Sequence, residues 1–138
     1  MCGSVAVSGV VRPGDKLMSD SDLNGLKVLV VEDEMLVSML VEDMLSDLGC
    51  TVVGPAAELE EAMTLATTAD IDMALLDVNL GGKPIFPVAD ALKARGVPFA
   101  FASGYGEAGL SEDHRGAAVL QKPFREADLE RALKSLRA

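Results

Sequence analysis

The stretch that decides the fold is Ile71-Asp72-Met73-Ala74-Leu75-Leu76-Asp77, a nearly continuous apolar run closed by an acid. A run this short and this apolar is typical of a buried strand in a parallel sheet, because helices cover both faces of such a strand. The acidic cluster Glu32-Asp33-Glu34 follows a second run of this kind, Val28-Leu29-Val30-Val31. The pattern therefore predicts that Asp77 ends one buried strand and that the three acids follow another.

Two more polar groups stand at the ends of predicted strands. Ser103 closes the run Phe99-Ala100-Phe101-Ala102, and Lys122 follows Val119-Leu120-Gln121. In an open parallel sheet the carboxyl ends of the strands gather at one edge, where ligands bind. We therefore expect the carboxylates, the hydroxyl and the ammonium to line one pocket.

Such a pocket suits a hard divalent cation and a phosphoryl group. Two carboxylates about 4 Å apart repel each other by roughly 4 kcal/mol at an effective dielectric near 20, and a cation relieves that repulsion. Oxygen ligands with space left for water and phosphate favour Mg²⁺. Glu32, Asp33 and Asp77 are the candidate acids of this site, with Asp77 as the nucleophile. The Ser103 hydroxyl can donate a hydrogen bond to a phosphoryl oxygen, and Lys122 can supply a positive charge.

From Leu26 onward, predicted strands and helices alternate. The strands are expected at 27–31, 50–53, 71–76, 98–102 and 118–121. Gly54-Pro55 is expected to break the second strand, and residues 81–84 are expected to form a loop. The first helix carries an apolar stripe that stops before Gly49 and consists of Val37, Leu40, Val41, Met44, Leu45 and Leu48. Five apolar strands with intervening helices predict an α/β fold, a doubly wound parallel sheet with helices on both faces.

The composition limits the class of protein. The chain has 138 residues, enough for one domain without disulfide or metal support, and we expect a loosely ordered tail over residues 1–25 and a folded domain over residues 26–138. The formal net charge of -10 argues against binding to nucleic acid or to an anionic membrane surface. Cys2 and Cys50 have no metal-binding or redox spacing, and no apolar stretch is long enough to span a membrane. These features favour a cytoplasmic location.

At the pocket residues the chain resembles the receiver domain of bacterial two-component response regulators, from about Lys27 to the C-terminus. The resemblance implies a flavodoxin-like strand order, 2-1-3-4-5, and a phosphoryl group accepted on Asp77. It also implies that Asp33 binds Mg²⁺ directly, that Glu32 does so through water, and that the Asn79 carbonyl completes the metal shell. Ser103 matches the family's Ser/Thr position. Gln121-Lys122-Pro123-Phe124 matches the lysine motif, whose Lys-Pro peptide bond is expected to be cis.

The run Pro98-Phe99-Ala100-Phe101-Ala102-Ser103-Gly104-Tyr105 resembles the "FAT GUY" subgroup of single-domain receivers, with Ser103 in place of the usual Thr. This resemblance implies a histidine kinase of the HWE/HisKA_2 type as the phosphodonor. The output is then expected through a contact with another protein, through relay of the phosphoryl group, or through action as a phosphate sink. Apart from self-dephosphorylation, no enzymatic activity is expected.

One departure from the family pattern changes the expected signalling mechanism. Most receivers have an aromatic residue three positions before the lysine, and here that position is Val119. The segment Gly104–Gly116 contains four glycines, and each glycine lowers helix propensity by about 1 kcal/mol. We expect this segment to switch by becoming ordered, through contacts of Ser103 and Tyr105; a static glycine-rich loop is the alternative.

Three other functions share parts of this pattern. A phosphatase of the haloacid dehalogenase kind would need an acid two residues after the nucleophile, where this chain has Asn79. A flavin-binding protein would need a glycine- and hydroxyl-rich first loop, and Glu32-Asp33-Glu34 would instead repel the flavin phosphate. A degenerate receiver that binds proteins without being phosphorylated stays open as the alternative function. Phosphorylation by acetyl phosphate would separate that alternative from a working receiver.

Overall fold

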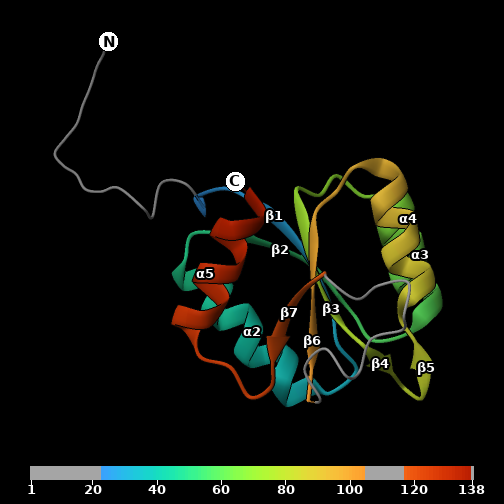
Figure 1. Cartoon of the computed structure of the whole chain (residues 1–138), viewed down its shortest axis with the longest axis horizontal. Coiled ribbons are helices and arrows are strands. Elements are labelled where there is room, and N and C mark those ends of the chain that lie inside the picture. Colours follow the sequence, from blue (N-terminus) through green and yellow to red (C-terminus); the bar gives the residue numbers. More distant parts are fainter. Residues whose placement is uncertain (1–22, 105–116, 138) are drawn as a thin grey trace, which may run out of the picture.

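The computed structural model describes residues 23–104 and 117–137, and within them the chain folds into a parallel sheet between two pairs of helices (Figure 1). The sheet strands are β1 (Lys27–Val31), β2 (Thr51–Ala56), β3 (Met73–Asp77), β6 (Phe99–Ser103) and β7 (Ala118–Gln121). Their order across the sheet is β2-β1-β3-β6-β7. Counting these five strands alone, the order is 2-1-3-4-5, so the expected doubly wound arrangement is confirmed.

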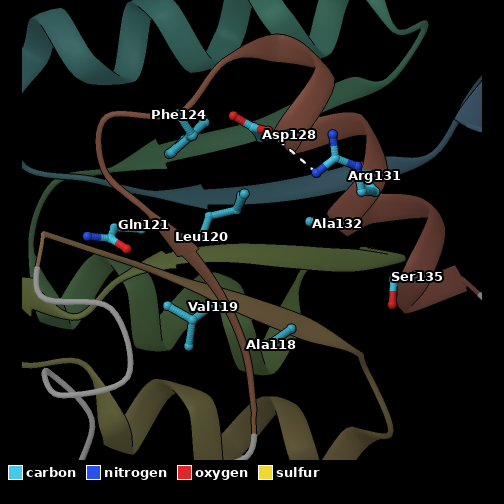
Figure 2. A pocket seen from close by; sticks show the side chains of 9 residues that line it. All are labelled: Ala118, Val119, Leu120, Gln121, Phe124, Asp128, Arg131, Ala132 and Ser135. Atoms are coloured by element: carbon cyan, nitrogen blue, oxygen red, sulfur yellow. Dashed lines mark ion pairs between the residues drawn. The ribbon is translucent and has the colours of Figure 1, made fainter.

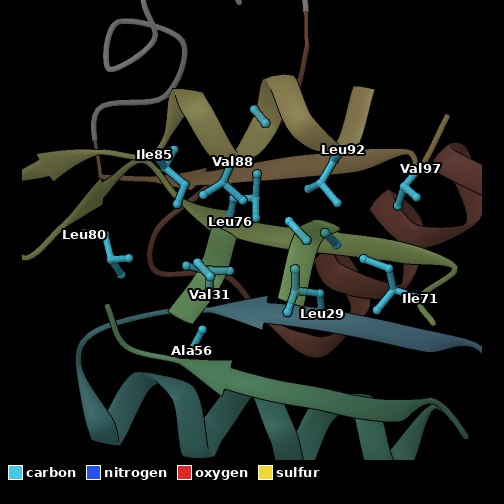
Figure 3. Packing of buried hydrophobic residues seen from close by; sticks show 14 of the residues in the cluster. Leu29, Val31, Ala56, Ile71, Leu76, Leu80, Ile85, Val88, Leu92 and Val97 are labelled. Carbon is cyan, nitrogen blue, oxygen red and sulfur yellow. The ribbon is translucent and has the colours of Figure 1, made fainter. Parts of the chain in front are cut away.

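Each face of the sheet is covered by two helices. The helices α2 (Met35–Asp47) and α5 (Glu126–Arg137) pack on one face, and α3 (Leu59–Thr68) and α4 (Phe86–Arg95) pack on the other (Figure 1). Successive strand residues point to opposite faces, so each strand contributes to both cores. In β1, Leu29 and Val31 pack toward α3 and α4 (Figure 3), and Val28 and Val30 pack toward α2 and α5.

The first described residue of the chain packs into the core. Leu23 has no exposed surface and packs with the side chains between the sheet and the helices α2 and α5. The Gly25 amide donates a hydrogen bond to the Gly49 carbonyl at 2.7 Å, which ties this entry segment to the start of β2. Among the described residues, Leu23 thus already belongs to the core, although it lies within the tail expected over residues 1–25.

The buried face of α2 differs from the predicted stripe. Val41, Leu45 and Leu48 are buried as expected, but Leu40 is 59% exposed. Ser38 is buried instead, with its hydroxyl donating to the Met35 carbonyl. A helix turns about 100° per residue, and the inward arc is centred on Val41 and Leu45, so Leu40 lies outside it. The prediction for Leu40 was wrong because apolar residues occur on more than one side of this helix.

The expected break of the second strand at Gly54-Pro55 was also wrong. Strand β2 continues through both residues to Ala56, with a register shift against β1 between Leu29 and Val31. Pro55 is tolerated because β2 is at the edge of the sheet, where a missing backbone donor costs no ladder hydrogen bond. The Gly54-Pro55 bond is cis, and Gly54 has a φ of 94°, a conformation that favours glycine.

The expected loop over residues 81–84 forms part of a small hairpin. Strand β4 (Asn79–Leu80) pairs antiparallel with β5 (Lys83–Pro84), and the two-residue turn between them is Gly81-Gly82. Both glycines have a positive φ, of 57° and 84°, as a tight hairpin turn of type I′ requires. After the hairpin, α4 begins with Pro87 in its first turn and ends at Gly96 in the left-handed conformation. In the described part of the chain, no helix is both long and apolar enough to cross a membrane.

Candidate functional site

A pocket of about 640 Å³ opens at the carboxyl edge of the sheet. Glu32 and Asp33 directly follow strand β1, and Asp77 ends β3. Ser103 ends β6, and Lys122 follows β7. Four of the predicted site residues line this pocket together, namely Asp33, Asp77, Ser103 and Lys122. The placement follows from the parallel pairing of the strands, which brings all of these ends to one side.

Three carboxylates meet in the pocket. Glu32, Asp33 and Asp77 each offer an oxygen atom, and these oxygens all lie within 4.8 Å of one another. Glu32 and Asp77 are only 5% and 9% exposed, whereas Asp33 is exposed. The Val78 amide donates to the Ala102 carbonyl at 3.1 Å, and the Glu32 amide donates to the Ala56 carbonyl at 3.0 Å. These backbone bonds extend the sheet to the acids and hold them close together.

Protein donors already contact both carboxylate oxygens of Glu32. Its Oε2 accepts a hydrogen bond from the Glu34 amide at 3.1 Å, and its Oε1 accepts one from Lys122 Nζ at 2.9 Å. Glu32 is therefore oriented by the chain itself, with less freedom to turn toward a ligand than an exposed acid has.

Lys122 lies between two acids. Its Nζ is 2.9 Å from Glu32 Oε1 and 3.3 Å from Asp77 Oδ1. Partial burial disfavours the ammonium and acts to lower the pKa of Lys122, but its hydrogen bond to Glu32 and the charge of Asp77 outweigh this effect. The pKa of Lys122 is therefore raised, and the side chain carries its positive charge at neutral pH.

Ser103 is 3% exposed and stands beside the lysine. Its carbonyl accepts a hydrogen bond from the Lys122 amide at 2.9 Å, so the pairing of β6 with β7 continues one residue past the end of β7. The Lys122-Pro123 peptide bond is cis, as predicted. Asn79 starts β4, two residues past Asp77.

Two features of the site were missed in the sequence. The Gly81 amide donates a hydrogen bond to Asp33 Oδ2 at 2.9 Å, and Gly82, Pro84 and Phe86 form part of the pocket lining. The signal that could have revealed the hairpin is the Gly-Gly pair, which is a common two-residue hairpin turn. A single sequence does not reveal that the Gly81 amide at the tip contacts Asp33, which lies 48 positions away.

A second pocket, of about 540 Å³, lies between β7 and α5 (Figure 2). It is lined by Ala118, Leu120 and Ala132 together with polar residues such as Asp128 and Arg131, whose side chains form an ion pair. None of the predicted site residues lines it. Among the described residues, the predicted site residues that line a pocket together are those at the carboxyl edge of the sheet.

Comparison with known proteins agrees with this geometry. The profile of the response regulator receiver domain matches residues 28–134. The chain belongs to the response regulator receiver family. The phyllosphere-induced regulator PhyR of Methylorubrum extorquens is 33% identical over 107 residues, which are 75% of this chain. The chain spans 40% of the length of PhyR and about half the length of the other curated relatives that it matches.

Two solved receivers are similar in sequence and fold. SdrG from Sphingomonas melonis Fr1 is 41% identical, with a TM-score of 0.74, and the match covers 85% of this chain and 98% of SdrG. The receiver domain of the sensor histidine kinase PA1611 from Pseudomonas aeruginosa PAO1 is 27% identical, with a TM-score of 0.69, over 82% of this chain and 98% of that domain. That structure contains a magnesium ion coordinated in its active-site cleft.

The part of the receiver fold expected to carry the signal is only partly described. Residues 105–116, which include Tyr105 and most of the glycine-rich segment, lie outside the described residues. Val119, at the position of the usual aromatic residue, is half-buried and pairs with Phe101 in the sheet. Phe101 is fully buried and makes edge-to-face contacts with Phe86 and Phe99, at centroid distances of 5.8 Å and 5.4 Å. The expected switch by ordering of the segment Gly104–Gly116 stays a prediction.

Proposed function

We propose that this receiver accepts a phosphoryl group on Asp77 from a sensor histidine kinase. The observation that carries the proposal is the position of Asp77 at the end of the central strand, with Lys122 Nζ 3.3 Å from its Oδ1 and two further carboxylates beside it. A carboxylate in this position has a cation at hand for the incoming phosphoryl group, and the pocket leaves space for that group. Phosphoryl transfer depends mainly on such positioning and charge neutralisation.

The proposed reaction is an in-line displacement at phosphorus. An oxygen of Asp77 attacks the phosphorus of a phosphohistidine, a new O–P bond forms, and the P–N bond breaks with its electron pair going to the imidazole nitrogen. Lys122 balances negative charge on the phosphoryl oxygens, and Ser103 donates a hydrogen bond to one of them. Later attack by water on the phosphorus releases inorganic phosphate and restores the carboxylate. Apart from this self-dephosphorylation we propose no enzymatic activity.

The acids fit a magnesium ion. They offer only oxygen ligands, and an exposed Asp33 leaves room for water, as Mg²⁺ requires. Asp33 and Asp77 would bind directly together with the Asn79 carbonyl. Glu32 would act through water, because both of its oxygens already accept hydrogen bonds from the chain. A bound ion would supply the charge that lets a carboxylate approach a phosphoryl group.

An exposed apolar surface on α2 supports a protein as the phosphodonor. We define the α2 surface by its four members, which are the exposed large apolar side chains among the described residues: Met35, Leu36, Met39 and Leu40. Beside it, an apolar groove of about 330 Å³ runs between α2 and Pro123-Phe124. Glu34 and Lys122 line both this groove and the pocket around Asp77.

A helix that carries a phosphohistidine could therefore pack on the α2 surface and present its phosphate to Asp77. A helix laid into an apolar groove is a common way for proteins to recognise one another. The resemblance to the "FAT GUY" subgroup favours a kinase of the HWE/HisKA_2 type. The proposed location is the cytoplasm, where ATP is available to such a kinase.

For the output, we propose a contact of the phosphorylated receiver with another protein, or transfer of its phosphoryl group to another histidine. A PhyR from Bartonella quintana, 25% identical to this chain, is described as an anti-anti-sigma factor, which supports output by protein contact.

The experiment that tests the proposal is phosphorylation by acetyl phosphate with Mg²⁺, read by intact-protein mass spectrometry. The wild-type protein should gain one phosphoryl group, the Asp77→Asn variant none, and Asp90→Asn, which changes an exposed acid on α4, should behave as wild type. Incorporation into Asp77→Asn would place the phosphoryl group elsewhere. No incorporation into the wild type, from acetyl phosphate or from a kinase, would favour the degenerate receiver.

A further inference from the structure

The hairpin β4–β5 is anchored on both sides of its tip. Leu80, in β4, is 2% exposed, and Ile85, directly after β5, is fully buried. The Ile85 amide donates to the Val78 carbonyl at 3.1 Å, which closes the base of the hairpin. The turn itself, Gly81-Gly82, is exposed. The buried Leu80 and Ile85 therefore hold the tip at the carboxyl edge of the sheet, although the two glycines of the tip have no side chains to pack.

The tip contacts the acid that is least constrained otherwise. Asp33 is exposed, so its side chain is not held by the core. The Gly81 amide reaches it across 48 positions of sequence and donates to Oδ2 at 2.9 Å. A carboxylate with one oxygen fixed by a donor can offer its other oxygen in a defined direction. By contrast, Glu32 has both oxygens engaged and Asp77 is held by its strand.

We propose that the Gly81 backbone amide is a positioning group for the magnesium site, holding Asp33 so that its second oxygen faces the ion. The inference rests on the proposed function, because it concerns the same pocket. Groups that orient a metal ligand contribute to affinity without touching the ion. Since the donor is a backbone amide, the sequence requirement at this position is conformational: Gly81 has a φ of 57°, which other residues adopt only with strain.

The coupling runs in both directions. If the hairpin tip raises the affinity of Asp33 for the ion, the ion must by linkage stabilise the hairpin tip. The tip also adjoins the pocket for the phosphoryl group, because Gly82 and Pro84 line that pocket. Occupation of the metal site therefore makes one wall of the phosphoryl pocket more rigid.

The decisive test removes the N–H of Gly81 without changing its conformation. Replacing Gly81 by glycolic acid converts this amide into an ester, and a synthetic segment that starts at Cys50 can be joined to the rest of the chain by ligation. The matched control is the same ester at Gly82, whose amide is not the one that contacts Asp33. The readout is the Kd for Mg²⁺, from the change in thermal midpoint and from NMR titration, neither of which depends on phosphorylation.

The ester at Gly81 should weaken Mg²⁺ binding about tenfold, the lower end of the range for groups that orient metal ligands. The ester at Gly82 should have much less effect. In an Asp33→Ala background, which should lose most Mg²⁺ binding, the two esters should lower the metal-free thermal midpoint equally, because the acceptor of the Gly81 hydrogen bond is gone. Equal Kd values for the two esters in the wild-type background would overturn the inference while leaving the magnesium site intact. A wild-type protein that binds no Mg²⁺ would overturn the site itself.

Hydrogen exchange gives a second measurement if an ester variant does not fold. In wild-type protein without metal, the Gly81 amide should be protected, and Asp33→Ala should remove that protection while the amides of β3 keep theirs. Adding Mg²⁺ to the wild type should slow exchange at Gly81 further. A Gly81 amide that exchanges equally fast in the wild type and in Asp33→Ala would contradict the proposed contact.

Discussion

Lys122 contacts Glu32 more closely than it contacts Asp77: its Nζ lies 2.9 Å from Glu32 Oε1 and 3.3 Å from Asp77 Oδ1. Lys122 thus stabilises the negative charge of Glu32, which the chain already orients. It also lies close enough to Asp77 to interact with negative charge that forms on that side chain.

Replacing Lys122 by Met should destabilise the protein in the absence of Mg²⁺. Three carboxylates would then share the pocket without a cation, and loss of one partner of a partly buried pair costs about 1–3 kcal/mol. Because the ion compensates for the missing charge, saturating Mg²⁺ should recover part of the loss. Denaturant unfolding with and without Mg²⁺ measures both quantities. An equal loss of unfolding free energy with and without Mg²⁺ would show that the ion does not bind among these acids.

The stability that Lys122 contributes through its contacts with Glu32 and Asp77 should depend on pH, because its pKa is raised. A group whose pKa is higher in the folded than in the unfolded state contributes its full stability below the unfolded pKa, whose ordinary value is 10.5. The difference in stability between wild type and Lys122→Met should therefore be constant from pH 7 to about pH 9 and shrink as the pH rises through the folded pKa. Unfolding curves at several pH values would measure it.

Mg²⁺ should raise the melting temperature of the wild-type protein. An ion that binds only the folded state adds about 2.7 kcal/mol at a concentration one hundred times its Kd. Asp33→Ala should remove most of this increment, and Asp90→Asn should keep it. A thermal scan across a Mg²⁺ titration decides the matter. An increment of equal size in Asp33→Ala would mean that Asp33 is not a ligand.

The α2 surface should affect phosphotransfer from a kinase but not from acetyl phosphate. The double variant Met39→Gln/Leu40→Gln keeps good helix formers at two exposed positions, so stability should change by no more than about 0.5 kcal/mol each. Transfer from the cognate kinase should slow by about tenfold or more, and labelling by acetyl phosphate should be unchanged. Glu60→Gln, on α3 at the opposite face of the sheet, is the control. Equal slowing with both phosphodonors would point to damage at the pocket instead.

Asp128 should make the stability of α5 depend on acid pH. Its Oδ2 accepts a hydrogen bond from the Arg125 amide at 3.0 Å, just before the helix begins, and this bond, with the neighbouring arginines, lowers the pKa of Asp128. The contribution of a carboxylate with a lowered pKa is present above its ordinary value of 3.8 and is lost as the pH falls through the folded pKa. Asp128→Asn should thus lower the melting temperature at pH 7 and have less effect near pH 2. An effect that does not change with pH would exclude the charge as its cause.

The sequence predicted that Asp33, Asp77, Ser103 and Lys122 would lie at one edge of the sheet, because strand ends are easy to locate. Asp77 and Ser103 each close an apolar run, and Lys122 follows one a residue later, so parallel pairing was enough to bring them together. The pairing of Lys122 with Glu32 could not be predicted, since it depends on the rotamer of each side chain. Leu40 was misplaced because apolar residues occur on several sides of α2, and periodicity alone does not say which side faces the sheet.

The edge strand β2 and the hairpin β4–β5 show a second limit of prediction from the sequence. Gly54-Pro55 usually ends a strand, but at the edge of a sheet a missing N–H is tolerated, and position in the sheet is a property of the whole fold. Gly81-Gly82 was interpreted as a loop because its flanking strands have only two residues each. Strands that short are stabilised by what lies next to them, in this case the buried Leu80 and Ile85.

Arg95 joins the two helices on one side of the sheet. From the last turn of α4, its Nη1 and Nη2 donate to the carbonyls of Ala66 and Ala69 at 2.6 Å and 2.8 Å, at the end of α3. Between α2 and α5, the acidic side chains of Asp47 and Glu126 interact and help to raise the pKa of Glu126 above its ordinary value. The two hydrogen bonds of Arg95 oppose any separation of α4 from the end of α3. A shift of α4 after a partner binds would therefore be passed to the end of α3 as well.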